Sequence, residues 1–170
     1  MKALIVTDML FDFIYGALKC ERAKRIIPNI RRLIDKAHQE GWLVVYVNDT
    51  HDESDRELKI WGPHAMRGSD GDRVIEELKP TSKDKVIEKH FYSAFVETEL
   101  NDYLKANNVD EIILVGVQAH ICIINTAASA YNYGYKIKAP KNCIEAFDET
   151  NYNYAISYVK DYFMADTSEM

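Results

Sequence analysis

The feature that most constrains the fold is a repeated alternation of short, continuously apolar runs with longer segments of helical period. Residues 3–7 are apolar almost throughout, as expected for a strand that is covered on both faces of a sheet. Between residues 26 and 38 the apolar side chains recur every three or four positions, which indicates a helix, and Gly41 follows as its stop. Such an alternation is typical of parallel sheets whose strands are joined by helices.

The same reading extends to the rest of the chain. Further strands are predicted at residues 42–47, 85–88, 111–117 and 135–139, with a short final strand at 164–166, and further helices at 98–108, 121–133 and 149–163. This order predicts an α/β fold in one domain spanning residues 1–170. We expect a three-layer sandwich with a largely parallel, roughly six-stranded, Rossmann-like sheet and helices on both faces.

Composition narrows the classes of function. The 170 residues carry a formal net charge of -6, and Lys and Arg form no basic patch, so no nucleic-acid partner is expected. No apolar run approaches the roughly 20 residues of a membrane span, and the apolar start is too short for a signal peptide. The odd number of cysteines, three, lacks metal-finger spacing. We therefore expect a cytoplasmic protein with free thiols and no membrane partner.

Three reactive side chains fall at or just beyond predicted strand ends, where ligands of open parallel sheets bind. Asp8 follows the first strand, Lys89 follows the third, and Cys122 lies where the chain turns from the fourth strand into a helix. A partly buried Asp8 suits a general base, and a helix N-terminus at Cys122 would stabilise a thiolate. Each residue also has an ordinary structural interpretation: Asp8 as a turn cap, Lys89 as a solvated lysine and Cys122 as a buried thiol. The three together favour a catalytic site.

Three sequence runs carry a resemblance to a known family. They are ALIVTDMLFDF at residues 3–13, EKHFYSAF at 88–95 and GVQAHICI at 116–123, followed by Thr126-Ala127 and Gly134-Tyr135. In this order they resemble the isochorismatase-like cysteine hydrolases, which include nicotinamidases and N-carbamoylsarcosine amidases. The resemblance implies a catalytic triad of Asp8, Lys89 and Cys122. It also implies a cis peptide at Val117-Gln118 and an oxyanion site made by the backbone amides of Gln118 and Cys122.

The resemblance extends to the long irregular stretch at residues 48–72, a length typical of a binding or lid segment. It implies a divalent metal, zinc foremost, held by Asp49, His51 and His64, and aromatic pocket walls from Phe13 and Trp61. Relatives with acidic residues after this loop, as at 52, 55 and 57 here, do not all carry metal, so a hydrogen-bonded loop is the alternative. Gln118 and His120 depart from the residues common in the family and leave specificity open. No organic cofactor is expected.

The function predicted from these residues is hydrolysis of a small amide through a thioester, with an N-carbamoylsarcosine-like or nicotinamide-like substrate. The residues do not separate the two, although the acidic loop leans toward the first. The alternatives are a vinyl ether hydrolase of the isochorismatase type and a non-catalytic binding module. A thiol redox protein is disfavoured because no Cys-x-x-Cys pair is present. Members of the family that the chain resembles are often dimers or tetramers, and the chain contains 11 tyrosines, a residue enriched at protein interfaces. We therefore expect a homo-oligomer.

Overall fold

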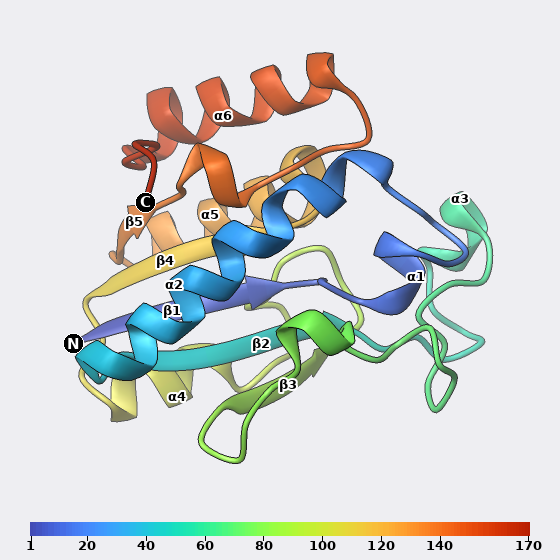
Figure 1. Ribbon diagram of the computed structural model, residues 1–170, viewed down its shortest axis with the longest axis horizontal. Helices are drawn as coiled ribbons and strands as arrows, with labels where there is room; N and C mark the ends of the chain where they lie inside the picture. The colour runs from blue at the N-terminus through green and yellow to red at the C-terminus, as the bar shows by residue number, and fades with distance from the viewer.

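The computed structural model describes residues 1–170 as a five-stranded parallel sheet between two layers of helices (Figure 1). The strands are β1 (Lys2–Thr7), β2 (Leu43–Asp49), β3 (Lys85–Lys89), β4 (Glu111–Gly116) and β5 (Lys136–Lys138), in the order β3-β2-β1-β4-β5. All neighbouring pairs are parallel. The predicted α/β fold with a parallel sheet is confirmed.

The helices divide between the two faces of the sheet because side chains of a strand alternate in direction. Leu4 and Val6 of β1 pack into one core with α2 (Ile27–Glu40), which crosses the front of the sheet in Figure 1. Ala3 and Ile5 pack into the other core with α4 (Leu100–Ala106), α5 (Ile124–Asn132) and α6 (Glu149–Phe163). The shorter elements are α1 (Phe11–Ile14), α3 (Leu58–Trp61), η1 (Glu21–Ile26), η2 (Glu76–Leu78), η3 (Ala119–Ile123) and η4 (Lys141–Cys143).

The expected sixth strand at residues 164–166 is reduced to a single parallel bridge between Lys138 and Asp166. Met164 ends α6 in the left-handed conformation, with φ 55°, and only Asp166 then meets β5. The sheet therefore has five strands.

Two features of the fold position the site. The carboxyl ends of β1, β2, β3 and β4 lie at one edge, and the direction of winding reverses between β1 and β4, where parallel sheets bind ligands. Gly116, at the end of β4 with φ 116°, pairs with Thr7; a methyl group there would lie 2.0 Å from the Thr7 carbonyl oxygen. The close approach of β4 to β1 therefore requires glycine.

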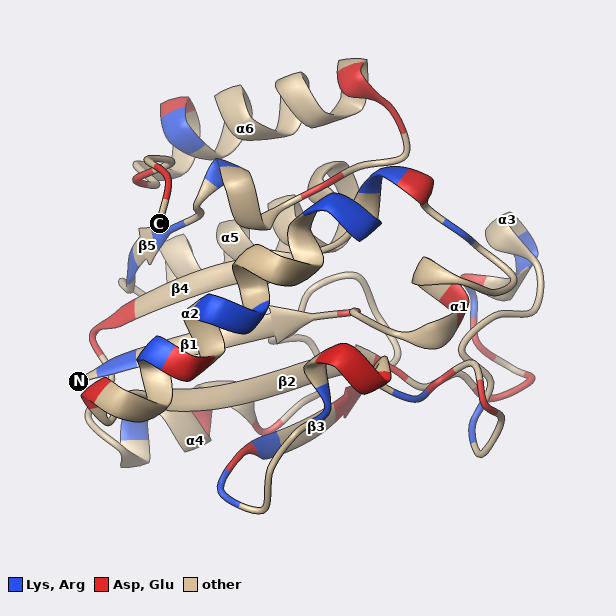
Figure 2. Ribbon diagram, viewed as in Figure 1, with Lys and Arg blue, Asp and Glu red and all other residues tan.

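Positively and negatively charged residues are intermixed over the helices and loops (Figure 2). On α2, for example, Arg31 pairs with Asp35 at 2.7 Å. None of the helices combines the length and the apolar character that crossing a bilayer requires.

Candidate active site and metal centre

The strand ends bring Asp8, Lys89 and Cys122 together in the interior. Asp8 directly follows β1 with φ 55°, Lys89 is the last residue of β3, and Cys122 lies in the π-helical turn η3 after β4. The Lys89 Nζ lies 3.0 Å from Asp8 Oδ2 and donates to the Cys122 sulfur at 3.6 Å. Asp8 and Lys89 have no exposed surface, and Cys122 is 5% exposed. Residues separated widely in the sequence therefore form one buried cluster.

Asp49, the last residue of β2, is a further member of this cluster. Its Oδ1 accepts a hydrogen bond from Lys89 Nζ, and its backbone N–H donates to Asp8 Oδ1 at 2.8 Å. Lys89 also donates to the Phe91 carbonyl at 3.1 Å. The ammonium thus has two carboxylates and a carbonyl around it, which offsets the cost of burying its charge.

Burial sets the protonation of the cluster. Burial and the Asp49 charge raise the pKa of Asp8 to about 7, although Lys89 opposes the rise. Burial also raises the pKa of the Cys122 thiol well above its usual value, against the lowering effect of Lys89. Burial would lower the pKa of Lys89, but the charges of Asp49, Asp8 and Cys122 raise it well above its usual value. The cluster at rest therefore holds an ammonium and a neutral thiol beside a carboxylate that can accept a proton near neutral pH.

The state of the thiol differs from the expectation that a helix N-terminus would stabilise a thiolate. Cys122 lies inside η3, two residues before α5, and the loss of solvation outweighs the lowering effect of Lys89 on the pKa of the thiol. A nucleophilic thiolate here requires a base, and the Asp8 carboxylate and the Cys122 sulfur lie within 4.8 Å of one another.

The turn after β4 provides a candidate oxyanion site. The Val117-Gln118 peptide is cis. The N–H of Ala119 bonds the Glu145 carbonyl at 2.8 Å, and those of Ile121 and Ile123 bond the Gln118 carbonyl, whereas the Gln118 N–H has no protein acceptor. That amide remains free for a substrate oxygen.

A second cluster adjoins the first through Asp49. It comprises Asp49, His51, Glu57 and His64, all buried, with one potential ligand atom from each within 4.8 Å of the others. His51 Nε2 lies 3.6 Å from Asp49 Oδ2 and 3.5 Å from Glu57 Oε2, and His64 Nε2 lies 3.9 Å from Glu57 Oε2. Sequence reasoning found three of these residues; it took the acidic residues after the loop as a feature of metal-free relatives, and so missed Glu57.

Both imidazoles are held so that Nε2 faces the cluster. His51 Nδ1 donates to Asp55 at 2.8 Å, and His64 Nδ1 donates to the Gly62 carbonyl at 2.7 Å. His51 Nε2 and Glu57 Oε1 are buried without a hydrogen-bond partner. Burial lowers the pKa of His51, but Asp49 and Glu57 outweigh it and raise that pKa to about 10. Two imidazoles, two carboxylates and orphaned buried atoms fit a divalent metal.

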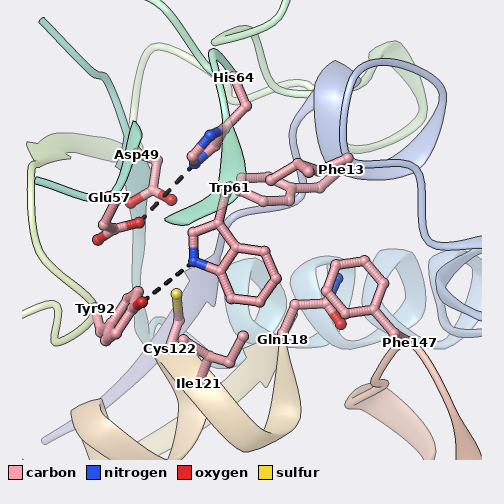
Figure 3. A pocket seen from close by; sticks show the side chains of 11 residues that line it. Phe13, Asp49, Glu57, Trp61, His64, Tyr92, Gln118, Ile121, Cys122 and Phe147 are labelled. Carbon is pink, nitrogen blue, oxygen red and sulfur yellow. Dashed lines mark hydrogen bonds and ion pairs between the residues drawn. The ribbon is translucent and has the colours of Figure 1, made fainter. Parts of the chain in front are cut away.

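The pocket over Cys122 has mostly apolar walls (Figure 3). Phe13 and Trp61 line it as expected, and Trp61 Nε1 donates to the Tyr92 hydroxyl at 3.2 Å while its ring lies 6.2 Å from that of Phe147. The remaining lining residues are Leu18, Asp49, Glu57, His64, Gln118, Ile121 and Cys122. The space among them, including the part open to solvent, is about 280 Å³. The part of this space that the centre of a water-sized sphere can occupy is about 20 Å³, far below the roughly 300 to 1,000 Å³ of pockets for drug-sized ligands, so the ligand is compact.

Asp12 connects two walls of this pocket. Its side chain accepts from the Ala65 N–H at 2.9 Å and from the Ala17 N–H at 3.1 Å. A methyl group on Gly71 would lie 2.1 Å from the same carboxylate. The loop that carries His64 is thereby held against α1. Tyr92 belongs to a run noted in the sequence, but Phe147 gave no signal because it lies in an irregular segment after η4.

Comparisons with known proteins agree with this geometry. The isochorismatase domain family matches residues 2–169. The crystal structure of N-carbamoylsarcosine amidase from Thermoplasma acidophilum is similar with a TM-score of 0.93 and 38% identity, covering 99% of this chain and 95% of that one. The crystal structure of nicotinamidase/pyrazinamidase PncA from Bacillus subtilis is similar with a TM-score of 0.94 and 31% identity, covering 99% of both.

A curated relative extends the agreement. Nicotinamidase from Saccharomyces cerevisiae is 28% identical over 181 residues, covering 80% of this chain and 84% of its own. Because the family match covers nearly the whole chain, and the site lies where the topology places it, the protein belongs to the isochorismatase family of hydrolases.

Proposed function

We propose that the protein is a cysteine-dependent amidohydrolase that cleaves a compact amide through a thioester intermediate. The observation that carries the proposal is the position of the Cys122 thiol: it lines the pocket, with Lys89 3.6 Å from its sulfur and the Asp8 carboxylate nearby. Amide-cleaving relatives support the same reaction class.

The mechanism begins with transfer of the Cys122 proton to Asp8 as the sulfur adds to the amide carbonyl carbon. The oxygen takes up the negative charge and accepts from the backbone amides of Gln118 and Cys122. Asp8 then gives its proton to the leaving nitrogen, the carbon–nitrogen bond breaks, and ammonia or an amine departs. In the second half Asp8 takes a proton from water, which attacks the thioester; the carbon–sulfur bond breaks, the acid departs, and Asp8 returns the proton to the Cys122 thiolate. Lys89 keeps Asp8 oriented throughout.

A divalent metal is proposed in the cluster of Asp49, His51, Glu57 and His64, with zinc as the ion that suits two imidazoles and two carboxylates. Such an ion supplies a Lewis-acidic anchor for a polar group of the substrate. The chain's own residues perform the proton transfers, and Asp49 contacts both the ammonium and the metal cluster.

Two substrate types remain, and a separate observation supports each. The aromatic walls of Phe13, Trp61, Tyr92 and Phe147 favour a flat, nicotinamide-like amide. The 38% identity to an N-carbamoylsarcosine amidase favours a carbamoyl amine. Neither type requires a change in the mechanism.

The test is ammonia release from a panel of small amides, with alkylation of the protein by iodoacetamide as a second measurement. Cys122→Ala is expected to abolish ammonia release and the single selective alkylation. Cys143→Ala is the matched control, because this thiol is fully buried in the core beneath α2 and does not line the pocket. Retention of most of the rate by Cys122→Ala would exclude the thioester mechanism.

We also propose that the chain forms a homo-oligomer. Tyr154, Tyr158 and Tyr162 form a row of mutually tilted rings along α6, with centroids 5.5 Å and 4.7 Å apart, and Tyr154 and Tyr162 are more than half exposed. Tyrosine is enriched at protein interfaces, so this row is the surface that we expect to be covered. Light scattering of active enzyme at micromolar concentration checks this, and a mass near 19.6 kDa would contradict it.

A further inference from the structure

The side chain of Gln118 is an anomaly within the pocket. Gln118 is 3% exposed and lines the pocket together with Cys122, yet neither its amide nitrogen nor its amide oxygen has a hydrogen-bond partner. The Cys20 thiol donates to the Ala146 carbonyl at 3.3 Å; burial raises the pKa of this thiol and the nearby Gln118 side chain opposes the rise, but no hydrogen bond of regular geometry joins the two groups. Most buried polar atoms in proteins are hydrogen-bonded, because an unpaired buried group loses its solvation without a replacement. A carboxamide left unpaired at a pocket wall therefore points to a ligand.

The position of this amide relates it to the substrate rather than to the metal. In Figure 3 the Gln118 side chain ends beside the Phe147 ring, across the Trp61 ring from Tyr92 and from the carboxylates of the metal cluster. The apolar residues Leu18, Ile121 and Phe147 line the same pocket. A substrate whose scissile carbonyl lies at the thiol meets Gln118 as the polar group at the end opposite the metal cluster.

Charge and hydrogen-bonding capacity define what fits there. No lysine or arginine lines the pocket, whereas Asp49 and Glu57 do, so an anionic tail finds no cationic side chain. A carboxamide offers two hydrogen-bond donors and one acceptor oxygen. A ligand group that both accepts and donates hydrogen bonds therefore satisfies it fully. We propose that Gln118 is a specificity-determining residue that pairs with a second, uncharged amide or urea group of the substrate, distinct from the amide that is cleaved. This inference rests on the proposed amidohydrolase function.

The experiment compares three amides of nearly equal shape in the full-length enzyme. Malonamide carries the second amide, isovaleramide replaces it with an isopropyl group, and malonamate replaces it with a carboxylate. Wild-type enzyme is expected to prefer malonamide to isovaleramide by roughly tenfold or more in kcat/KM, because an unfilled polar site rejects the apolar analogue. Malonamate is expected to be the poorer of the two polar substrates.

The variant is Gln118→Met, which keeps the length of the side chain and removes both hydrogen-bonding functions. The ratio of kcat/KM for malonamide to that for isovaleramide is expected to fall to about 1, because the variant loses the one or two hydrogen bonds that Gln118 makes to the second amide. Its thermal unfolding midpoint is expected to equal or exceed that of wild type, because an unpaired buried amide is removed. A ratio that stays at the wild-type value, or a lowered midpoint that indicates a protein partner for the amide, overturns the inference.

Gln118→Glu serves as the second variant. It retains an acceptor, loses both donors and adds charge, so it is expected to depress malonamate further than isovaleramide. Equal effects on the two substrates would contradict the assignment.

The outcomes separate this inference from the proposed function. Ammonia release that depends on Cys122 but shows no malonamide preference in wild type overturns the role of Gln118 alone. Absence of both ammonia release and Cys122 alkylation overturns the amidohydrolase itself.

Discussion

Replacement of Lys89 by methionine tests the electrostatics of the buried cluster. Methionine retains the apolar stem but removes the ammonium that lies between Asp8 and Asp49, so two buried carboxylates lose their cation. Removing one partner of a buried ion pair costs about 3 to 5 kcal/mol. At a slope near 2 kcal/mol per molar, that loss corresponds to a urea midpoint lowered by about 1.5 to 2.5 M. The measurement is equilibrium urea unfolding of chelator-treated protein at pH 7, followed by circular dichroism.

The matched control lies on the same strand. Lys85 at the start of β3 pairs with Glu99 at 2.7 Å, but its side chain is one-third exposed. Such a surface pair contributes about 0 to 1 kcal/mol, so Lys85→Met is expected to shift the midpoint little. Lys89→Met with Asp8→Asn should recover part of the loss, because it removes one uncompensated charge. If Lys89→Met were no more destabilising than Lys85→Met, the reasoning about the cluster would be wrong.

The deficit of Lys89→Met also depends on pH. In wild type the pKa of Asp8 is about 7 in the folded state, against an ordinary value of 3.8, so folding retains a proton on this carboxyl below pH 7. A raised pKa favours folding at low pH, and that contribution is lost as the pH rises through the folded pKa. Without Lys89, which lowers it, the pKa of Asp8 rises further. The gap between variant and wild type is therefore expected to be larger at pH 8 than at pH 5.

Other variants address separate parts of the site. Asp8→Asn should lower kcat/KM by roughly 100-fold or more and slow iodoacetamide alkylation of Cys122 at neutral pH; unchanged alkylation would refute the proton transfer between them. Glu57→Gln should weaken metal binding by more than about tenfold, measured by competition with a fluorescent chelator, whereas the exposed Glu53→Gln should not. Gly116→Ala should lower the free energy of unfolding by about 3 kcal/mol or more, because its methyl group would meet a backbone oxygen of β1; a near-native urea midpoint would contradict this.

The sequence predicted the sheet well because strands covered on both faces are apolar throughout. It also placed Asp8, Lys89 and Cys122 at strand ends, and parallel topology brings such ends to one edge. Where the expectation was wrong, the cause was burial. Proximity to a helix indicated a stabilised thiolate at Cys122. How deeply this side chain is buried, however, depends on how the sheet and the helix layers pack together, and the local sequence does not show it.

The metal cluster was harder to predict for a different reason. Residues 52–57 contain four acidic side chains, and nothing in their order distinguishes the one that turns inward. The structure uses them separately: Asp52 pairs with Arg67 at 2.9 Å, Asp55 holds His51 and His90, and Glu57 faces the cluster. Likewise Asp49 was assigned to the metal alone, and its contact with Lys89 becomes visible only in the register of β2 and β3.

The wide sequence spacing of the buried cluster has a consequence for how the protein acquires its reactivity. Asp8 and Asp49 are 41 positions apart, Asp49 and Lys89 are 40 apart, and Lys89 and Cys122 are 33 apart. Each contact spans the whole connection between two or more strands, and long-range parallel pairings form slowly because their loop entropy must be overcome first. No contiguous half of the chain contains the whole cluster, so a nascent polypeptide carries the Asp8 base before it has the Cys122 thiol, and an N-terminally truncated chain carries the thiol without its base. Chemical competence therefore arrives only when β1, β2, β3 and the turn after β4 are all in place, and recovery of catalysis reports the assembly of these four segments.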